Sequence, residues 1–294
     1  MFEDLLIALF CKIDDFCANF EPHFRAILLS KRRSFTRIPR MNLSEIMSII
    51  IAFHFSKFRT FKDFYFLGSF ILKKYFPKIV SYNRFIELMP RAIFPLFCLL
   101  QGELKPCSGI SFIDSTILSS CHIRRASSHK TFKAIASKGK TSTGWFYGLK
   151  LHLVIDEKGE ILAFQLSSGN VHDLIPVEDL VTKLFGYLFG DKGYLSAKTF
   201  KKLYEKGIKL ITTFRKNMKN KLMLPLEKLL LRCRGVIESV NNRLKHGYQI
   251  EHHRHRSPIN FSLQISLEGS CVISFSRKSL LYIYLLKKNS SFSL

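Results

Sequence analysis

The chain has 294 residues, of which 47% are hydrophobic and 13% aromatic, so a disordered protein is excluded and a substantial core is possible. Lys and Arg total 46 against 22 Asp and Glu, which gives a net charge of +24 and a pI near 9.9. This excess favours a polyanionic partner, and we expect nucleic acid rather than an anionic membrane surface. The alternative explanation is an AT-rich genome, which enriches Lys, Phe and Ile without a functional reason.

The cysteines and the N-terminus indicate a cytoplasmic protein. Seven scattered cysteines without a CxxC pair predict neither a disulfide framework nor a zinc site. Glu3 and Asp4 precede the first apolar run, unlike the basic start of a signal peptide. We find no stretch that approaches the roughly 20 apolar residues of a membrane span, so we expect no membrane partner.

Residues 1–105 are predicted to form an all-α N-terminal domain that binds DNA. Apolar residues recur at helical spacing over 5–13, and Ser44 is expected to cap a second helix over 45–56. Shorter helices are predicted over 60–74 and 82–100. The basic loop that starts at Lys31 is a candidate DNA contact, although a solvated polar face explains it equally well.

Residues 106–262 have the pattern of an α/β domain. Strands are predicted over 110–114, 147–155, 161–167, 187–190 and 209–214, and helices over 173–185, 197–206 and 225–246. Asp156 is expected in the hairpin turn between the second and third strands, and Asp173 as the cap of the first helix. The order predicts a mixed sheet with helices on its faces.

Two isolated acids are expected at the carboxyl ends of strands. Asp114 ends the apolar run 110–114, and no other carboxylate occurs before Asp156. Asp191 follows the strand 187–190 and precedes a turn. Ligand sites of open α/β sheets gather at this edge, and two carboxylates there repel each other unless a cation lies between them. Taken alone, Asp191 is explained as a turn residue.

A third acid lies on the last predicted helix. Leu230, Cys233, Ile237, Val240 and Leu244 form an apolar stripe that must face the sheet, and a polar face lies beside it, composed of Arg234, Glu238, Asn241 and Lys245. Glu238 is therefore expected at the border of the buried stripe, facing the other two acids. Its alternative role is a surface ion pair with Arg234.

Three carboxylates suit Mg²⁺ or Mn²⁺. Two such ions can hold a phosphodiester during in-line displacement, one activating the attacking oxygen and the other stabilising the leaving oxygen. Arg234 and Lys245 are expected to hold the phosphate.

Seven segments in order resemble the DDE transposases of bacterial insertion sequences, specifically those of insertion sequence family 982. The segments lie at 12–17, 43–56, 112–116 (Phe-Ile-Asp-Ser-Thr), 144–152 (Gly-Trp-Phe-Tyr-Gly-Leu-Lys-Leu-His), 169–173 (Gly-Asn-Val-His-Asp), 190–194 (Gly-Asp-Lys-Gly-Tyr) and 237–258. The resemblance implies an RNase H-like fold, with Asp114, Asp191 and Glu238 as first, second and third catalytic acids. Arg234 and Lys245 match the family's Arg and Lys around the Glu, whereas the Tyr of some relatives is Leu231 here.

The resemblance implies DNA partners, namely the terminal inverted repeats of the element and the target DNA, and a homodimer in a nucleoid-associated active complex. The predicted DNA-contacting residues are Lys192, Arg234, Lys245, Arg124, Arg125, Lys130, Lys138, Lys140, Arg254 and Arg256. Trp145, the only tryptophan, is expected to pack on the sheet, with stacking on an unpaired base as the alternative.

The segment 263–294 departs from the family pattern, because helical periodicity is poor after Phe261. We hypothesise that a reading-frame shift replaced the native tail and impaired the activity. Two other functions remain open for the chain as a whole. These are a metal-dependent nuclease that cuts without strand transfer and a non-catalytic DNA-binding protein.

Overall fold

A computed structural model describes residues 2–30, 40–56, 58–141, 144–213, 224–247 and 250, with only the backbone for 25–30. The predicted tail at 263–294 and most of the basic loop after Lys31 lie outside these residues. Within the described residues, contacts divide the chain into two compact units, which meet in sequence between Glu103 and Leu104.

The first unit is helical, as the sequence predicts. Its elements are α1 (Phe2–Ser30), α2 (Leu43–Phe55), α3 (Phe61–Leu67), α4 (Ser69–Tyr75), α5 (Tyr82–Leu88), the 3₁₀ turn η1 (Met89–Ala92) and α6 (Ile93–Glu103). Asn42, and not Ser44, caps α2: the Glu45 carboxylate accepts the Asn42 backbone N–H at 2.8 Å, and Ser44 is buried inside the helix. The predicted helix over 60–74 is two helices that meet at Gly68, where a side chain would lie 2.5 Å from the Phe64 carbonyl oxygen.

The segment Tyr82–Glu103 corrects one sequence expectation. It is 22 residues long and contains an 18-residue window with a mean hydropathy of 1.3, so by length and composition it could span a membrane. In the structure it comprises α5, η1 and α6; Phe94 and Phe97 are exposed, whereas Phe85 and Leu96 lie in the core of the first unit. These residues therefore already have a packing role within the unit.

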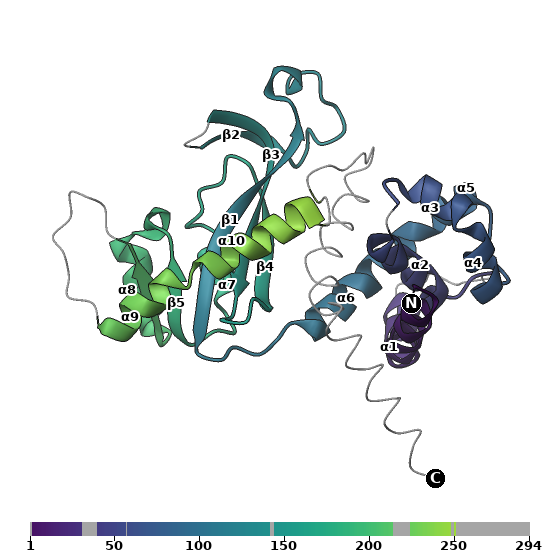
Figure 1. The fold of residues 1–294 in the computed structure, drawn as a ribbon, viewed down its shortest axis with the longest axis horizontal. Coiled ribbons are helices and arrows are strands. Elements are labelled where there is room, and N and C mark those ends of the chain that lie inside the picture. Colours follow the sequence, from purple (N-terminus) through teal and green to yellow (C-terminus); the bar gives the residue numbers. More distant parts are fainter. Residues whose placement is uncertain are drawn as a thin grey trace, which may run out of the picture. The chain divides into compact units, whose positions relative to one another are not determined.

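The second unit contains one six-stranded mixed sheet (Figure 1). Its strands are β1 (Ile110–Cys121), β2 (Ser137–Thr141), β3 (Gly144–Ile155), β4 (Ile161–Ser168), β5 (Gly186–Gly190) and β6 (Ile208–Thr212). The order is β2-β3-β1-β5-β6, and β4 also pairs with β3. Strand β1 is antiparallel to β3 and parallel to β5, and β5 is parallel to β6. The sequence did not predict β2, because Ser-Lys-Gly-Lys-Thr lacks alternating apolar residues.

Helices cover both faces of this sheet. They are α7 (Val177–Leu180), α8 (Ala197–Glu205), α9 (Pro225–Arg232) and α10 (Gly235–Asn242), the last continuing as a π turn (Arg243–Gly247), with 3₁₀ turns η2 (Ile123–Arg125) and η3 (Lys192–Tyr194). Leu203 of α8 and Val177 of α7 share a core with Ile113 of β1, and α10 runs across β1 in Figure 1. Side chains of successive strand residues alternate between faces, so Asp114 lies on the α10 face.

Two helices predicted in the second unit differ from the expectation. The helix predicted over 225–246 is interrupted near Cys233, which is exposed rather than part of the buried stripe, while Asn241 is 7% exposed. The helix predicted over 173–185 is only α7, and Pro176, not Asp173, precedes it.

The hairpin turn between β3 and β4 is formed as predicted, and it makes a stability prediction possible. Asp156 is 5% exposed, and its Oδ1 accepts the backbone N–H of Lys158 at 2.9 Å and of Glu160 at 2.8 Å. We expect Asp156→Ala to lower the free energy of unfolding by about 1–3 kcal/mol, because two donors lose their acceptor. Urea denaturation measures this change. Lys158→Ala in the same turn is the control, and equal stability of the two variants would contradict the prediction.

Candidate active site

Asp114 and Asp191 lie at the same level of two neighbouring parallel strands. Phe112 of β1 pairs with Phe189 of β5, and each acid comes two residues after its Phe, so both acids belong to the same face of the sheet. The sequence predicted Asp114 at the end of its strand. This is wrong, because β1 continues to Cys121 against β3. Asp114 does lie beyond Phe112, the last residue of β1 that pairs with β5. The expected carboxyl edge of the sheet therefore exists between β1 and β5.

The turn after β5 fixes the position of Asp191. The Asp191 Oδ1 accepts the backbone N–H of Lys192 at 2.7 Å, and the Tyr194 N–H donates to the Asp191 carbonyl at 2.9 Å. The Tyr194 ring is 3% exposed and anchors the turn in the core. Gly190 leaves room for it, since a side chain there would lie 3.1 Å from both Tyr194 and Ile113. Asp191 is thus a turn residue and a site candidate at once.

Arg234 links the two acids that flank it. Its Nη2 donates to Glu238 Oε1 at 3.0 Å, and its Nη1 lies 3.6 Å from Asp191 Oδ1. The ion pair with Glu238 was the alternative role of that acid, and it is present. The same guanidinium also contacts an acid from β5, so Glu238 lies beside the strand-edge acids as the helix pattern predicted. The Arg234 side chain is 22% exposed, against 46% for Asp191 and 58% for Glu238.

Asn241 holds Asp114 in place. Its Nδ2 donates to Asp114 Oδ2 at 3.1 Å across 127 residues of sequence. The sequence placed Asn241 on the polar face of the last helix but gave it no role in the site. Its spacing, three residues after Glu238 and seven after Arg234, was the available signal, because such residues share one side of a helix.

Burial dominates the electrostatics of Asp114. It raises the pKa of this carboxyl to about 6, a hydrogen bond from the Ser115 backbone and the charge of Arg234 lower the pKa, and the negative charges of Asp191 and Glu238 raise it. The three acids therefore form one electrostatic group, in which burial makes the anion of Asp114 unfavourable.

The donor set suits a hard cation. The group offers carboxylate oxygens, which Mg²⁺ and Mn²⁺ prefer, and no sulfur ligand. In the described part of the chain, however, no three His, Cys, Asp or Glu side chains converge closely enough to coordinate one ion as they stand. Arg234 instead supplies the positive charge between Asp191 and Glu238. The oxygen ligands and negative charges of the three acids therefore suit a metal cation, at the position that the Arg234 guanidinium occupies.

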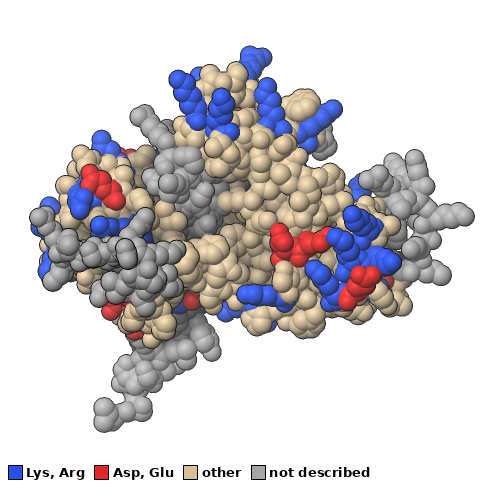
Figure 2. Space-filling model, turned by 180° about the vertical axis from the view of Figure 1, so that it is seen from behind, with Lys and Arg blue, Asp and Glu red and all other residues tan. Residues whose placement is uncertain are grey.

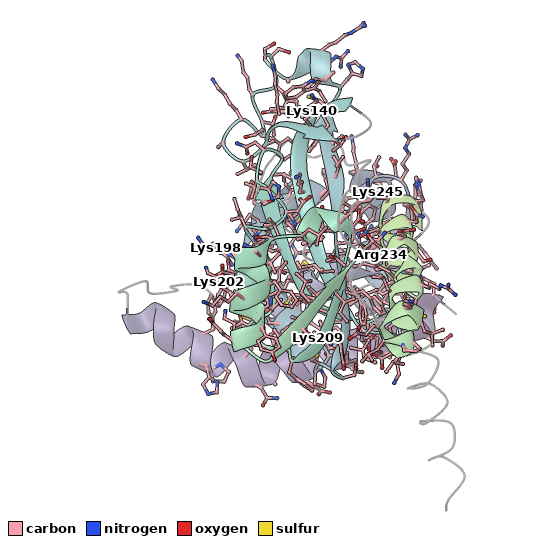
Figure 3. The ribbon with its side chains drawn as sticks, turned by 90° about the vertical axis from the view of Figure 1, so that its left-hand side faces the viewer. Lys140, Lys198, Lys202, Lys209, Arg234 and Lys245 are labelled. Atoms are coloured by element: carbon pink, nitrogen blue, oxygen red, sulfur yellow. The ribbon has the colours of Figure 1, made fainter. Side chains whose placement is uncertain are left out.

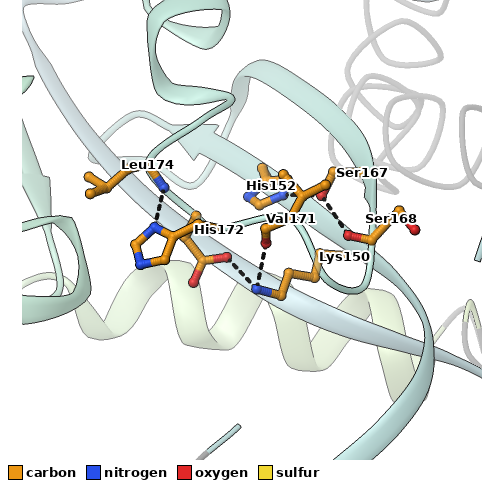
Figure 4. A network of polar contacts seen from close by, with 8 residues as sticks. Lys150, His152, Ser167, Ser168, Val171, His172 and Leu174 are labelled. Carbon is orange, nitrogen blue, oxygen red and sulfur yellow. Dashed lines mark hydrogen bonds and ion pairs between the residues drawn. The ribbon is translucent and has the colours of Figure 1, made fainter. Parts of the chain in front are cut away.

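A second polar network lies on the opposite face of β3 (Figure 4). Lys150 donates to Asp173 Oδ1 at 3.0 Å and to the Val171 carbonyl at 2.9 Å, and His152 Nε2 lies 2.7 Å from Ser167 Oγ. Asp173 therefore neutralises a half-buried Lys instead of capping a helix. Burial lowers the pKa of His152 to about 4, so its ring is neutral at pH 7. The network ties the segment after β4 to β3.

The predicted DNA-contacting residues fall into three places. Lys192 is exposed directly after Asp191, and Figure 3 shows Arg234 and Lys245 together on one side of the sheet, opposite Lys198 and Lys202 of α8. Five others are exposed at the far end of β1, β2 and β3, namely Arg124, Arg125, Lys130, Lys138 and Lys140. Arg254 and Arg256 lie outside the described residues.

Fold and site together define a class. A mixed sheet with an antiparallel β1–β3–β4 part and a parallel β1–β5–β6 part, carrying acids on β1, after β5 and on a crossing helix, is RNase H-like, as the sequence predicted. The family model for a transposase DDE domain matches residues 104–258, more than half of the chain. This chain belongs to the DDE transposase family, and it is a DNA transposase.

Comparison with solved structures agrees at the level of the fold. The piggyBac transposase in a cryo-EM synaptic complex with hairpin DNA is similar, with a TM-score of 0.52 and 12% sequence identity. The match covers 90% of this chain and 71% of that chain. No curated protein matches the chain.

Proposed function

We propose that this chain is the transposase of a bacterial insertion sequence similar to family 982. It cleaves the ends of the element and joins them to target DNA, with Asp114, Asp191 and Glu238 as the catalytic acids. One observation carries the proposal: Arg234 and Asn241, both on the last helix, bring acids from two strands and that helix into one electrostatic group.

The acids would hold two Mg²⁺ or Mn²⁺ ions. Asp114, Asp191 and Glu238 supply only oxygen donors, and the raised pKa of Asp114 indicates a carboxylate that gains from a nearby cation. When bound, such ions activate the attacking oxygen and neutralise the charge that develops on the scissile phosphate.

The residues around the acids would position the DNA. The Arg234 guanidinium can form two parallel hydrogen bonds with phosphate oxygens, and Lys245 adds positive charge on the same side of the sheet (Figure 3). Lys192 adds a further charge directly after Asp191. In the first step water attacks the phosphodiester and the P–O3′ bond breaks, leaving a 3′-hydroxyl on the element. In the second step this hydroxyl attacks a target phosphodiester. A new P–O3′ bond joins the element to the target phosphate, and the target's own P–O3′ bond breaks, which leaves a 3′-hydroxyl on the target strand.

The partners follow from this chemistry. The DNA is the element's terminal inverted repeats and the target, with the helical first unit contributing to end binding. A homodimer would bring two ends together, in the nucleoid of the bacterial cytoplasm. The piggyBac structure is of a synaptic complex with DNA, which supports a DNA partner here.

The test uses the full chain, Mg²⁺ and labelled duplexes that carry the element's own ends with a supercoiled target plasmid. We expect cut ends and joined products, both lost in EDTA. Cut ends without joined products would support the nuclease instead. Binding without cleavage would support the non-catalytic DNA-binding protein or an impaired C-terminal segment after Phe261. These two are separated by repeating the assay with a chain whose tail is encoded by the alternative reading frame.

A further inference from the structure

The side chain of Trp145 is exposed to solvent and is not part of the core. It is the only tryptophan of the chain, and it is 61% exposed at the start of β3. The expectation that it packs on the sheet is therefore wrong. It pairs across strands with Lys140 of β2, whose Nζ lies 5.7 Å from the centre of the indole ring. A cation against an exposed indole is an arrangement that also suits a base and its phosphate.

The surroundings of Trp145 are uniformly basic. The end of the sheet formed by residues 119–141 and 144–146, which we call the tip, carries exposed Lys and Arg side chains at 124, 125, 130, 133, 138 and 140. The sequence has no acidic residue between Asp114 and Asp156. Figure 2 shows this as a group of blue side chains without red at the upper end of the molecule. An anionic polymer is thus the partner that the charge of the tip favours.

Trp145 lies on the same face of β3 as the acid group. Leu153 of β3 pairs with Asp114, and Trp145 lies eight residues before it, so the two side chains have the same parity along the strand. Lys140 is opposite Trp145 and shares that face. At a rise of about 3.3 Å per residue, the indole lies roughly 26 Å along the strand from Asp114. That separation corresponds to about eight nucleotides at about 3.4 Å each.

We propose that Trp145 and Lys140 form a subsite for one unpaired nucleotide of the DNA substrate, about eight nucleotides from the scissile phosphate. The base stacks on the indole, and the Lys140 ammonium pairs with the adjacent phosphate. A base within a duplex has both faces covered by its neighbours, so the exposed indole selects a base that is not paired. This inference rests on the proposed function, since the distance is counted from its catalytic acids.

The single tryptophan makes the test specific, because the intrinsic fluorescence of the indole reports on this position alone. The full chain is titrated in EDTA, which prevents cleavage, with a blunt duplex of the element end and with the same duplex bearing an eight-nucleotide single-stranded extension. We expect the extension to quench the emission by more than about half and the blunt duplex to leave it nearly unchanged. Fluorescence anisotropy of labelled DNA measures binding in parallel.

Variants separate stacking from charge. Trp145→Ala should weaken binding of the extended DNA by about 5- to 150-fold, and Trp145→Phe should recover part of the loss. Both should bind the blunt duplex like the wild type. Lys140→Ala should reduce the affinity for both DNAs, with the larger reduction for the extended DNA. The control is Lys158→Ala, which removes an exposed charge beyond the other end of β3 and should change the affinity for both DNAs equally.

The outcomes distinguish the two proposals. Binding of the extended DNA without quenching, or equal quenching by both DNAs, would overturn the subsite and leave the proposed function intact. Absence of binding to either DNA would overturn both. Circular dichroism of the Trp145 variants checks that they are folded, and since the side chain is mostly exposed we expect no loss of structure.

Discussion

Asp114→Asn should lower the rate of Mg²⁺-dependent cleavage of the element end by on the order of 10³-fold or more, because the site loses several kcal/mol of charge stabilisation in the transition state. Asp191→Asn and Glu238→Gln should have effects of the same order, although their side chains are more exposed, since all three acids belong to one electrostatic group. Single-turnover cleavage of labelled ends measures the rate, and anisotropy measures DNA affinity, which should stay within a few-fold of the wild type.

Glu205→Gln is the matched control for these substitutions. It removes one carboxylate charge from the same unit, at the exposed end of α8, and it should cleave at the wild-type rate. Cleavage by any of the three acid variants within about tenfold of the wild type would remove that residue from the proposed catalytic set. Loss of DNA affinity equal to the loss of rate would indicate a binding role instead.

The same Asp114→Asn substitution should stabilise the protein at neutral pH. The folded protein keeps the Asp114 proton up to about pH 6, whereas the unfolded chain releases it near pH 4. The wild type therefore loses stability as the pH rises between these values, and the loss is complete above the higher one. Asn carries no such charge, so the variant should unfold with a free energy up to about 3 kcal/mol larger at pH 7.5, with no difference near pH 4.

Urea denaturation of both proteins from pH 4 to pH 8, in EDTA, measures this difference. The comparison between the two proteins is needed because His152, whose pKa is lowered to about 4, changes stability in the opposite direction over nearly the same range. Buried neutral in the fold, it makes both proteins less stable as the pH falls from about 6.5 towards 4. A variant that is less stable than the wild type at pH 7.5 would contradict the burial of an unfavourable charge at Asp114.

Magnesium should stabilise the wild type more than the Asp114→Asn variant. A cation that binds the acid group favours the ionised Asp114 and stabilises the folded wild type by mass action. Millimolar Mg²⁺ should thus narrow the stability gap at pH 7.5, while Asp114→Asn gains much less. An equal gain in the free energy of unfolding for both proteins, or no gain in either, would contradict the assignment of Asp114 to a metal site. This test does not depend on cleavage activity.

Much of the second unit could be predicted from local patterns. The alternation of Leu149, Leu151 and Leu153 predicted β3, and the turn residues around Asp156 predicted the hairpin to β4. Strand β2 could not be predicted, because its Lys residues belong to an edge that pairs only through the backbone of β3. The length of β1 was also underestimated, since the polar residues after Asp114 lie where β5 no longer covers the strand.

The sequence by itself determined the class of the protein, because isolated carboxylates in a strongly basic chain and seven ordered segments depend only on residue identity and spacing. Tertiary structure decided how those residues meet. Arg234 reaches Asp191 and Asn241 reaches Asp114 only because α10 crosses β1, contacts that no local pattern encodes. It also decided that Trp145 is exposed rather than packed on the sheet. Burial depends on which neighbours cover each side chain: Phe146 and Tyr147 at the start of β3 are buried, whereas Trp145 beside them is 61% exposed.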